Sequence, residues 1–223
     1  MSIGSKARTS VDAYFHSVSI LRDDMRRQLY SNAFKAQLGG YSAVQVFRRH
    51  AERAQTDDAL ALVQYLDIKT YLVGDINTKV DRASMAHSLE VREPLMDHLL
   101  VEWLASLPSS LKVRGQEGKY LLKKTMEPYL PSEIMYRPKQ GFAVPLERWF
   151  RGPLRQRLSD AILGSRLQET GVFNPRYLKH LVDAHLAGTR DYSSPLWTLL
   201  MFDAFLKNIA QSNVLDFREK VAG

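Results

Sequence analysis

Two stretches of this chain hold charged side chains at spacings that could do chemistry. The first is loop 136–145, Tyr-Arg-Pro-Lys-Gln-Gly-Phe-Ala-Val-Pro. Pro138 disfavours the helical conformation for Arg137, so the preceding helix is expected to stop there, and Gly141 permits a backbone path that other residues resist. The loop would present Lys139, whose ammonium group can meet a phosphate as a point charge. A helix–loop–helix turn with solvated charges is the more common explanation of such a loop.

The second stretch covers residues 71–98. Asp75, Lys79 and Arg82 stand at i, i+4 and i+7, which places them on one face of a helix. A functional interpretation puts this acid and these two cations on the rim of an anion site that faces the loop. A structural interpretation is a simple i, i+4 ion pair between Asp75 and Lys79, with no ligand.

The composition bounds the class of protein. With 223 residues, 45% of them hydrophobic and 25% charged, the chain suits one large globular domain or two small ones. It has no run of about 18 uncharged apolar residues and no apolar signal-peptide core. Cysteine is absent, which excludes disulfides and thiolate metal sites. The net charge of +7 fits a phosphate-bearing ligand or a basic surface without a partner. We expect a cytoplasmic protein with no membrane or nucleic-acid partner, because its cations are scattered among acids.

The residue pattern is helical almost throughout, and no convincing strand appears. Two or three short helices are expected over 9–38, one of them starting at Asp23. Ser42 is typical of an N-cap for the next helix. Gly74 is expected to interrupt a later helix, with Asp75 capping the one that follows.

Apolar residues at 3, 4 spacing predict helices that face a core. Each tryptophan lies on such a stripe, which favours a core position over a base-stacking platform. An Asn174-Pro175 pair is typical of a helix start. The stripes are Met96, Leu99, Leu100, Trp103, Leu104 and Leu107; Leu146, Trp149, Phe150, Leu154, Leu158 and Ile162; and the run from Leu196 to Phe202 that includes Trp197.

Four sequence blocks are similar to the synthetase domain of the glutamine-dependent asparagine synthetase family. They read Lys-Val-Asp-Arg-x-Ser-Met-Ala at 79–86, Leu-Glu-Val-Arg-x-Pro-Leu-Met-Asp-His at 89–98, a Gly-x-x-Lys and Leu-Pro block within 115–131, and Arg-Pro-Lys-x-Gly-Phe with a later Pro and Trp at 137–149. Four blocks in the family's order make a specific match. The Arg-Glu-Pro variant within 89–98 and the residues that follow Trp149 resemble most the branch associated with bacterial exosortase and polysaccharide loci.

The resemblance implies a mainly α fold. The chain would be the helical C-terminal half of an asparagine-synthetase-type domain, of the adenine nucleotide α-hydrolase-like class, without the parallel sheet. We expect a single helical domain over 1–223, with N-terminal helices at 1–55, a core carrying the family motifs at 56–150 and C-terminal helices at 151–223.

The resemblance also implies a ligase that makes an amide with ATP and Mg²⁺, as in asparagine biosynthesis. A substrate carboxylate, by default that of aspartate, attacks the α-phosphate of ATP to give an acyl-adenylate and pyrophosphate. Ammonia released from glutamine by a separate N-terminal domain then displaces AMP.

Residue roles follow from the matched motifs. Lys139 and Asp75 are the catalytic candidates, since the loop lysine of the family stabilises developing negative charge. Lys79, Arg82, Arg137 and Gly141 would border the substrate and its phosphates. Asp81, Glu90, Arg92 and Asp97 would hold the helix and turn in place. No metal site is expected, because the histidines lack partners at ligand spacing and the acids do not demand Mg²⁺.

Several parts of the family pattern are not found. Gly39-Gly40 lacks the Ser and Asp of the family's pyrophosphate loop, Ser-Gly-Gly-x-Asp-Ser, and no cysteine can cleave glutamine. We therefore expect the isolated chain to be incomplete and inactive, with ATP and Mg²⁺ bound only in the complete enzyme. Its partners would be a glutaminase domain, the ATP-binding half and a small-molecule carboxylate; homo-oligomer formation stays open. The alternative is a non-catalytic helical interaction module derived from the family.

Overall fold

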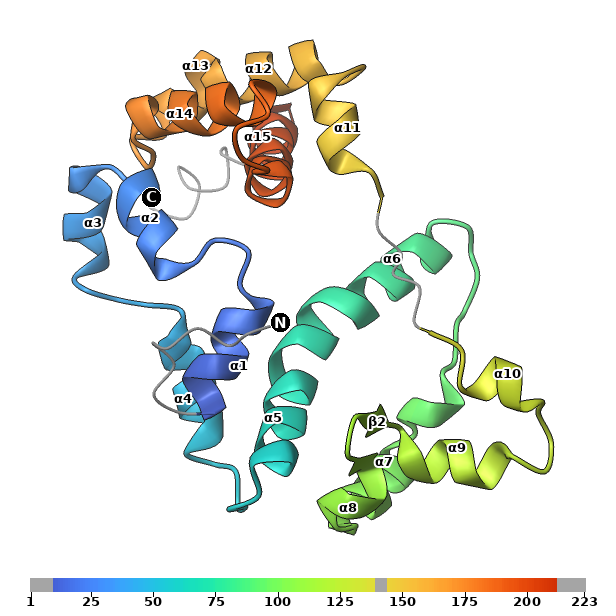
Figure 1. Ribbon diagram of the computed structural model, residues 1–223. Coiled ribbons are helices and arrows are strands. Elements are labelled where there is room, and N and C mark those ends of the chain that lie inside the picture. The colour runs from blue at the N-terminus through green and yellow to red at the C-terminus, as the bar shows by residue number, and fades with distance from the viewer. Residues whose placement is uncertain (1–9, 139–143, 212–223) are drawn as a thin grey trace. The chain divides into compact units, whose positions relative to one another are not determined.

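The structure, a computed structural model, describes residues 10–138 and 144–211 and is helical almost throughout (Figure 1). In these ranges the strands are β1 (Val113–Arg114) and β2 (Glu117–Gly118), an antiparallel pair. The predicted mainly α class is confirmed. Because two residues cannot show an alternating pattern, this hairpin could not be predicted from residue periodicity.

The chain forms two compact units. Unit 1 comprises Met1–Val18 and Ala43–Gly141, and unit 2 comprises Ser19–Ser42 and Phe142–Gly223. These boundaries differ from those of the regions 1–55, 56–150 and 151–223, because an N-terminal segment packs with the C-terminal helices. The single domain over 1–223 stays a prediction, and each unit is described by itself.

Unit 1 is built from short helices and the hairpin. In chain order its elements are α1 (Ser10–Val18), α4 (Val44–Ala51), α5 (Ala59–Asp67), the π-helix η1 (Ile68–Asn77), α6 (Thr78–Met85), the 3₁₀-helix η2 (Pro94–Met96), α7 (His98–Ser106), α8 (Ser109–Lys112), β1, β2, α9 (Tyr120–Met126) and α10 (Ser132–Met135). Helices α1, α4 and α5 pack against one another.

A continuous helical rod in unit 1 runs from α5 through η1 into α6 (Figure 1). Asp58 caps its start, where the side chain accepts a hydrogen bond of 2.7 Å from the backbone N–H of Ala61. The expected break at Gly74 is wrong, and Asp75 is not an N-cap. The helix passes Gly74 in the wider π form and continues into α6, and the carboxylate of Asp75 pairs with Lys79 instead.

Unit 2 contains the large hydrophobic core. Its helices are α2 (Asp23–Leu29), α3 (Asn32–Leu38), α11 (Leu146–Arg151), α12 (Arg155–Leu163), α13 (Ser165–Glu169), α14 (Pro175–Leu186) and α15 (Ser193–Gln211). The helix starts predicted at Asp23 and at Asn174-Pro175 are confirmed. The core consists of Leu29, Phe150, Leu158, Ile162, Leu167, Phe173, Leu178, Leu181, Val182, Tyr192, Leu196, Leu199 and Leu200.

The expectations about Ser42 and about the tryptophans are also wrong. The residue at the N-cap of α4 is Ala43, and the hydroxyl of Ser42 donates instead to the carboxylate of Asp23, at 3.1 and 3.3 Å from its two oxygens. The carboxylate is a charged acceptor, which makes a stronger hydrogen bond than a neutral one.

The tryptophans are also less buried than predicted. Trp103 is 54% exposed, and Trp149 and Trp197 are 38% and 39% exposed. In unit 2 the indole of Trp197 still stacks on Phe150, with ring centroids 6.4 Å apart. In unit 1 no residue of α7 is fully buried, so its apolar stripe does not form a core. No helix in the described ranges is long and apolar enough to cross a membrane.

Candidate functional site

A tight turn at the end of α6 shapes the candidate site. Ser88 adopts a left-handed conformation with φ 57°. The N–H of Ser88 donates to the carbonyl of Met85, and the N–H of Leu89 donates to that of Ser84, both at 3.0 Å. This is the Schellman pattern, which closes a helix and reverses the chain. Residues 90–93 therefore form a wall beside the helix they have just left.

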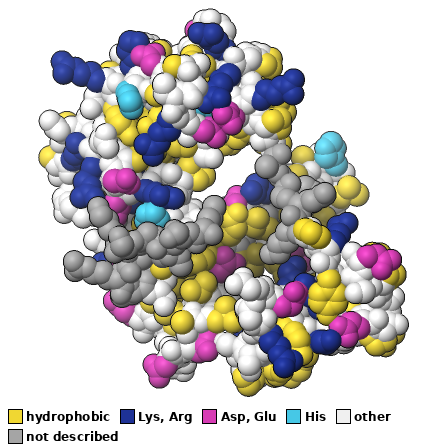
Figure 2. All heavy atoms as spheres, viewed as in Figure 1, with side chains coloured by type: hydrophobic (Ala, Val, Ile, Leu, Met, Phe, Trp, Pro, Cys, Tyr) yellow, Lys and Arg dark blue, Asp and Glu magenta, His cyan; other side chains and the backbone are white. Residues whose placement is uncertain are grey.

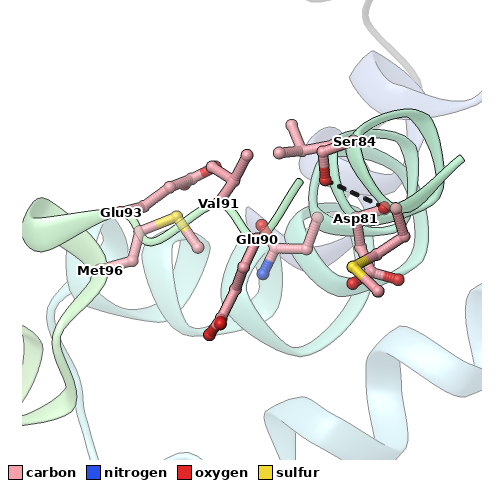
Figure 3. Close-up of a pocket in the computed structure, with 9 residues that line it drawn as sticks. Asp81, Ser84, Glu90, Val91, Glu93 and Met96 are labelled. Carbon is pink, nitrogen blue, oxygen red and sulfur yellow. Dashed lines mark hydrogen bonds between the residues drawn. The ribbon is translucent and has the colours of Figure 1, made fainter. Parts of the chain in front are cut away.

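A pocket of about 400 Å³ lies between α6 and this returning segment. In Figure 3, Asp81 and Ser84 on the helix lie opposite Glu90 and Val91, and Glu93 and Met96 continue the second wall. The Ser84 hydroxyl donates to the Asp81 carbonyl at 3.1 Å. The described residues that line it are Asn77, Val80, Asp81, Ser84, Met85, Glu90, Val91, Glu93 and Met96.

The lining offers mainly hydrogen-bond acceptors. Among the described residues it carries three carboxylates and no lysine or arginine. The Oδ1 atom of Asn77 is buried and has no hydrogen-bond partner among the described residues. Carboxylates repel phosphate, whereas ammonium and hydroxyl groups can donate to them. Arg82 and Arg92 pair with the carboxylates of Asp81 and Glu90, so among the described residues the carboxylate of Glu93 is the one left to accept from an amino or hydroxyl group.

The predicted pair Asp75 and Lys79 forms an ion pair of 2.7 Å but does not line the pocket. The hydrogen bond from Lys79, together with one from Tyr71, holds the pKa of Asp75 below its usual value. The same bond raises the pKa of Lys79. Both groups therefore stay charged near neutral pH.

The other predicted cations are dispersed. Arg82 is exposed and lies 3.5 Å from the carboxylate of Asp81, its neighbour in sequence. Arg137 is exposed. Lys139 and Gly141 lie outside the described residues.

The remaining predicted positions lie in the turn and at its end. Glu90 pairs with Arg92 at 2.5 Å. The carboxylate of Asp97 caps α7 by accepting from the N–H groups of Leu99 and Leu100, at 3.0 and 3.2 Å. Of the four predicted supporting residues, Asp81 and Glu90 thus line the pocket themselves.

Several pocket residues were not among the predicted site positions, including Glu93 and Asn77, whose Oδ1 atom has no partner among the described residues. A signal was available for one wall, because Asn77, Val80, Asp81, Ser84 and Met85 follow the spacing i, i+3, i+4, i+7, i+8 of one helix face. Nothing in the pattern indicated that Glu93 would return to this face, since that depends on the turn at Ser88.

A magnesium site does not fit the arrangement. Within residues 10–138 and 144–211, no three His, Asp or Glu side chains lie close enough to hold one metal ion. The pocket carboxylates come from different walls and would oppose the phosphates of ATP.

The amino-acid sequence matches a known protein family. The family model described as asparagine synthase matches residues 4–207. The chain belongs to the asparagine synthase family. It is 29% identical over 191 residues to asparagine synthetase (glutamine-hydrolysing) 1 of Bacillus subtilis (strain 168), which covers 86% of this chain and 29% of that protein. Members of this family use ATP.

Two further relatives match shorter segments. The asparagine synthetase (glutamine-hydrolysing) of Bos taurus is 31% identical over 139 residues, which is 54% of this chain and 25% of that protein. Amidase chry2 of Gibberella zeae is 28% identical over 115 residues, which is 48% of this chain and 17% of that protein. The chain spans less than a third of the length of these relatives. No solved structure matches.

Proposed function

We propose that this chain is a segment of a glutamine-dependent asparagine-synthetase-like ligase. The observation that carries the proposal is the family match over residues 4–207, which includes the blocks at 79–98 and 137–149. In the complete enzyme a substrate carboxylate attacks the α-phosphorus of ATP, and pyrophosphate leaves. Ammonia then attacks the acyl carbon, and AMP leaves.

The proposed roles divide between anionic and cationic groups. Lys139, with Arg137 and Gly141 in its loop, stabilises the charge that develops at the phosphates and the acyl-adenylate. Asp75 acts near the intermediate with Lys79. The pocket along α6 receives the amino end of the carboxylate substrate. Its carboxylates, and the Oδ1 atom of Asn77 that has no partner among the described residues, support this role.

Exposed apolar side chains of unit 1 support the proposed partners. Leu95, Leu99 and Trp103 recur at every fourth residue and are all more than half exposed. On the face drawn in Figure 2, hydrophobic side chains reach the surface over the α7–α9 part of the chain. A large exposed apolar surface marks a site of protein contact. We propose that the ATP-binding half, which operates together with a glutaminase domain, covers it.

The acceptor is proposed to be aspartate, by analogy with the relatives named asparagine synthetases. The likeness of Arg92-Glu93-Pro94 to the exosortase and polysaccharide-locus branch suggests a different carboxylate, on a sugar, peptide or polymer. Mass spectrometry of the products formed from a panel of carboxylates distinguishes these acceptors.

The test joins this chain to a glutaminase domain and an ATP-binding half and follows pyrophosphate release that depends on the carboxylate. Lys139→Ala should abolish release with folding intact, since the loop cation would be lost. Lys112→Ala removes a lysine of unit 1 that belongs to α8 and to none of the family blocks, and it should release pyrophosphate at the parental rate. Unchanged release by Lys139→Ala would contradict the role of Lys139.

The second candidate is the non-catalytic helical module, which the same apolar surface of α7 favours. The neighbouring coding sequence discriminates between the two. An in-frame upstream Ser-Gly-Gly-x-Asp-Ser supports the ligase, because this loop supplies the ATP-binding amides in the family. A flanking sequence without any nucleotide-binding loop supports the module.

A further inference from the structure

A second pocket lies in unit 2, where α2 and α3 meet the start of α14. Its volume is about 270 Å³. None of the family blocks at 79–98 and 137–149 contributes to it. It is lined by Arg27, Gln28, Lys35, Asn174, Arg176, Tyr177 and His180.

Backbone hydrogen bonds fix the walls of this pocket. The N–H of Asn174 donates to the carbonyl of Leu29 at 2.7 Å, and the N–H of Ser31 donates to that of Val172 at 2.8 Å. The hydroxyl of Ser31 adds a bond of 2.6 Å to the carbonyl of Gly171. Two segments far apart in the sequence are thus held at one spacing before any ligand arrives, which lowers the entropy cost of binding.

The pocket is strongly cationic. Arg27, Lys35 and Arg176 all line it, and no carboxylate of residues 10–138 and 144–211 does. Within the described ranges none of the three forms an ion pair: Arg27 donates only to the backbone carbonyl of Asp23, and Lys35 to the amide oxygen of Asn32 at 3.4 Å. On the face that Figure 2 draws, Lys and Arg side chains are frequent over the α2 and α14 part of the chain.

Like charges held together without counter-charges favour an anion that can bridge them. A phosphate presents several acceptor oxygens, and guanidinium groups match it with paired N–H donors. Burial raises the pKa of Tyr177, and the charge of Asp24 adds to this effect, so Asp24 lies near the pocket without lining it. Among the described residues, neither Asp24 nor another acid forms an ion pair with the three cations.

An aromatic wall stands beside the cations. The rings of Tyr177 and His180 stack, with centroids 5.7 Å apart and an angle of 30° between the planes. His180 also meets the nearly buried Tyr192 edge-on at 6.1 Å. A flat ring face of this kind suits the C–H face of a sugar or another planar group.

We propose that this pocket binds the phosphate monoester of a small polar molecule, with the phosphate between Arg27, Lys35 and Arg176 and the neutral part over Tyr177 and His180. The volume decides the ligand size, since pockets for drug-sized molecules range from about 300 to 1,000 Å³. A cavity just below this range holds a sugar phosphate rather than a dinucleotide. The site is independent of the ligase chemistry proposed for unit 1.

The experiment titrates the full chain with inorganic phosphate, glucose 6-phosphate and glucose, and follows the imidazole signals of His180 by NMR. Glucose 6-phosphate should give saturable shifts at lower concentration than phosphate, and glucose should give none. Arg176→Ala and Arg27→Ala should each weaken binding by about tenfold, because each removes a charge-assisted hydrogen bond. Tyr177→Leu should weaken binding of glucose 6-phosphate but not of phosphate.

The matched control is Arg157→Ala, which removes an exposed arginine of unit 2 from α12, outside the pocket. It should bind like the parent chain. An equal loss in this control would show that net charge alone attracts the anion. No loss in Arg176→Ala and Arg27→Ala would show that these two side chains do not hold the anion. Either result overturns the proposal. Binding to phosphatidylcholine vesicles that contain phosphatidic acid, without saturable binding of glucose 6-phosphate, would overturn the small-molecule ligand. Near-UV circular dichroism confirms that each variant is folded.

Discussion

In unit 2 the side chains of Leu158 and Ile162 on α12 are completely buried, whereas in unit 1 Leu99 on α7 is 65% exposed. All three lie on apolar stripes of helical spacing, so the sequence pattern does not separate them. The difference lies in the neighbours. Helix α12 packs against α13, α14 and α15, while α7 makes its main contacts with the short η2.

The two units therefore hold their structures by different means. Unit 2 relies on a shared hydrophobic core, in which each side chain is surrounded by others. In unit 1, α7 and the α6 turn rely on local devices such as the cap of Asp97 and the turn at Ser88. An apolar stripe shows which face of a helix would be buried by packing. Whether that face is buried depends on the number of helices that pack against it.

The largest effect is expected from truncating an apolar side chain in each unit. Phe150→Ala should lower the free energy of unfolding of unit 2 by about 3–5 kcal/mol, because it leaves a cavity in a closed core. Leu99→Ala in unit 1 should change stability by less than about 0.5 kcal/mol, as for most surface substitutions. Urea unfolding gives the free energies, and hydrogen exchange of α14 and α7 peptides assigns them to the units. Similar losses for both variants would break the contrast.

A smaller effect should appear when the cap of α7 is removed. Asp97→Ala should cost about 1 kcal/mol, because the N–H groups of Leu99 and Leu100 lose their acceptor. In unit 1 the cap would then count for more than the apolar residue Leu99, the reverse of the order expected in unit 2. Asp97→Ser keeps a capping oxygen and should restore most of the loss in hydrogen exchange of α7. A cost for Asp97→Ala below that of Leu99→Ala would contradict this order.

The smallest effect concerns the pH dependence of unit 2. His185 is completely buried, and its Nδ1 atom accepts a hydrogen bond of 3.1 Å from the N–H of Tyr192. Burial, helped by the charge of Arg151 and opposed by those of Asp191 and Glu147, lowers the pKa of His185 below 6.5. The unfolded chain then binds the proton first, so stability is complete above pH 6.5 and falls as the pH drops below it.

His185→Gln tests this effect, since glutamine does not titrate. The urea midpoint of unit 2 should then vary less between neutral pH and pH 5 than in the parent chain. His180→Gln serves as the control, because His180 is exposed and its change should leave the pH dependence unaltered. A parental pH dependence in His185→Gln would assign the acid sensitivity to another group.

Part of the fold followed from local residue chemistry. The Asn174-Pro175 pair starts α14, and the helix of Leu196 and Leu199 is central in unit 2, as the sequence predicted. In contrast, Ser42 was predicted to cap α4, but its hydroxyl donates a hydrogen bond to Asp23, a residue of α2. Local rules hold where all the partners are local.

The candidate site divides in the same way. The spacing of Asp75 and Lys79 predicted their contact, and the structure has it at 2.7 Å. The roles of these residues, and of Lys139, stay predictions. The acidic pocket was not foreseen, because Glu93 reaches the face of Asp81 only through the reversal at Ser88.

The sequence by itself determined the helical class, the helix starts at Asp23 and Asn174-Pro175, and the family, because these depend on residue type and on spacing along the chain. The tertiary structure decided which apolar stripes are buried, which cations have partners and where acids gather beside α6. These properties depend on residues far apart in the sequence, such as Leu29 and Asn174, whose backbone groups meet at 2.7 Å. No pattern within either segment specifies that meeting.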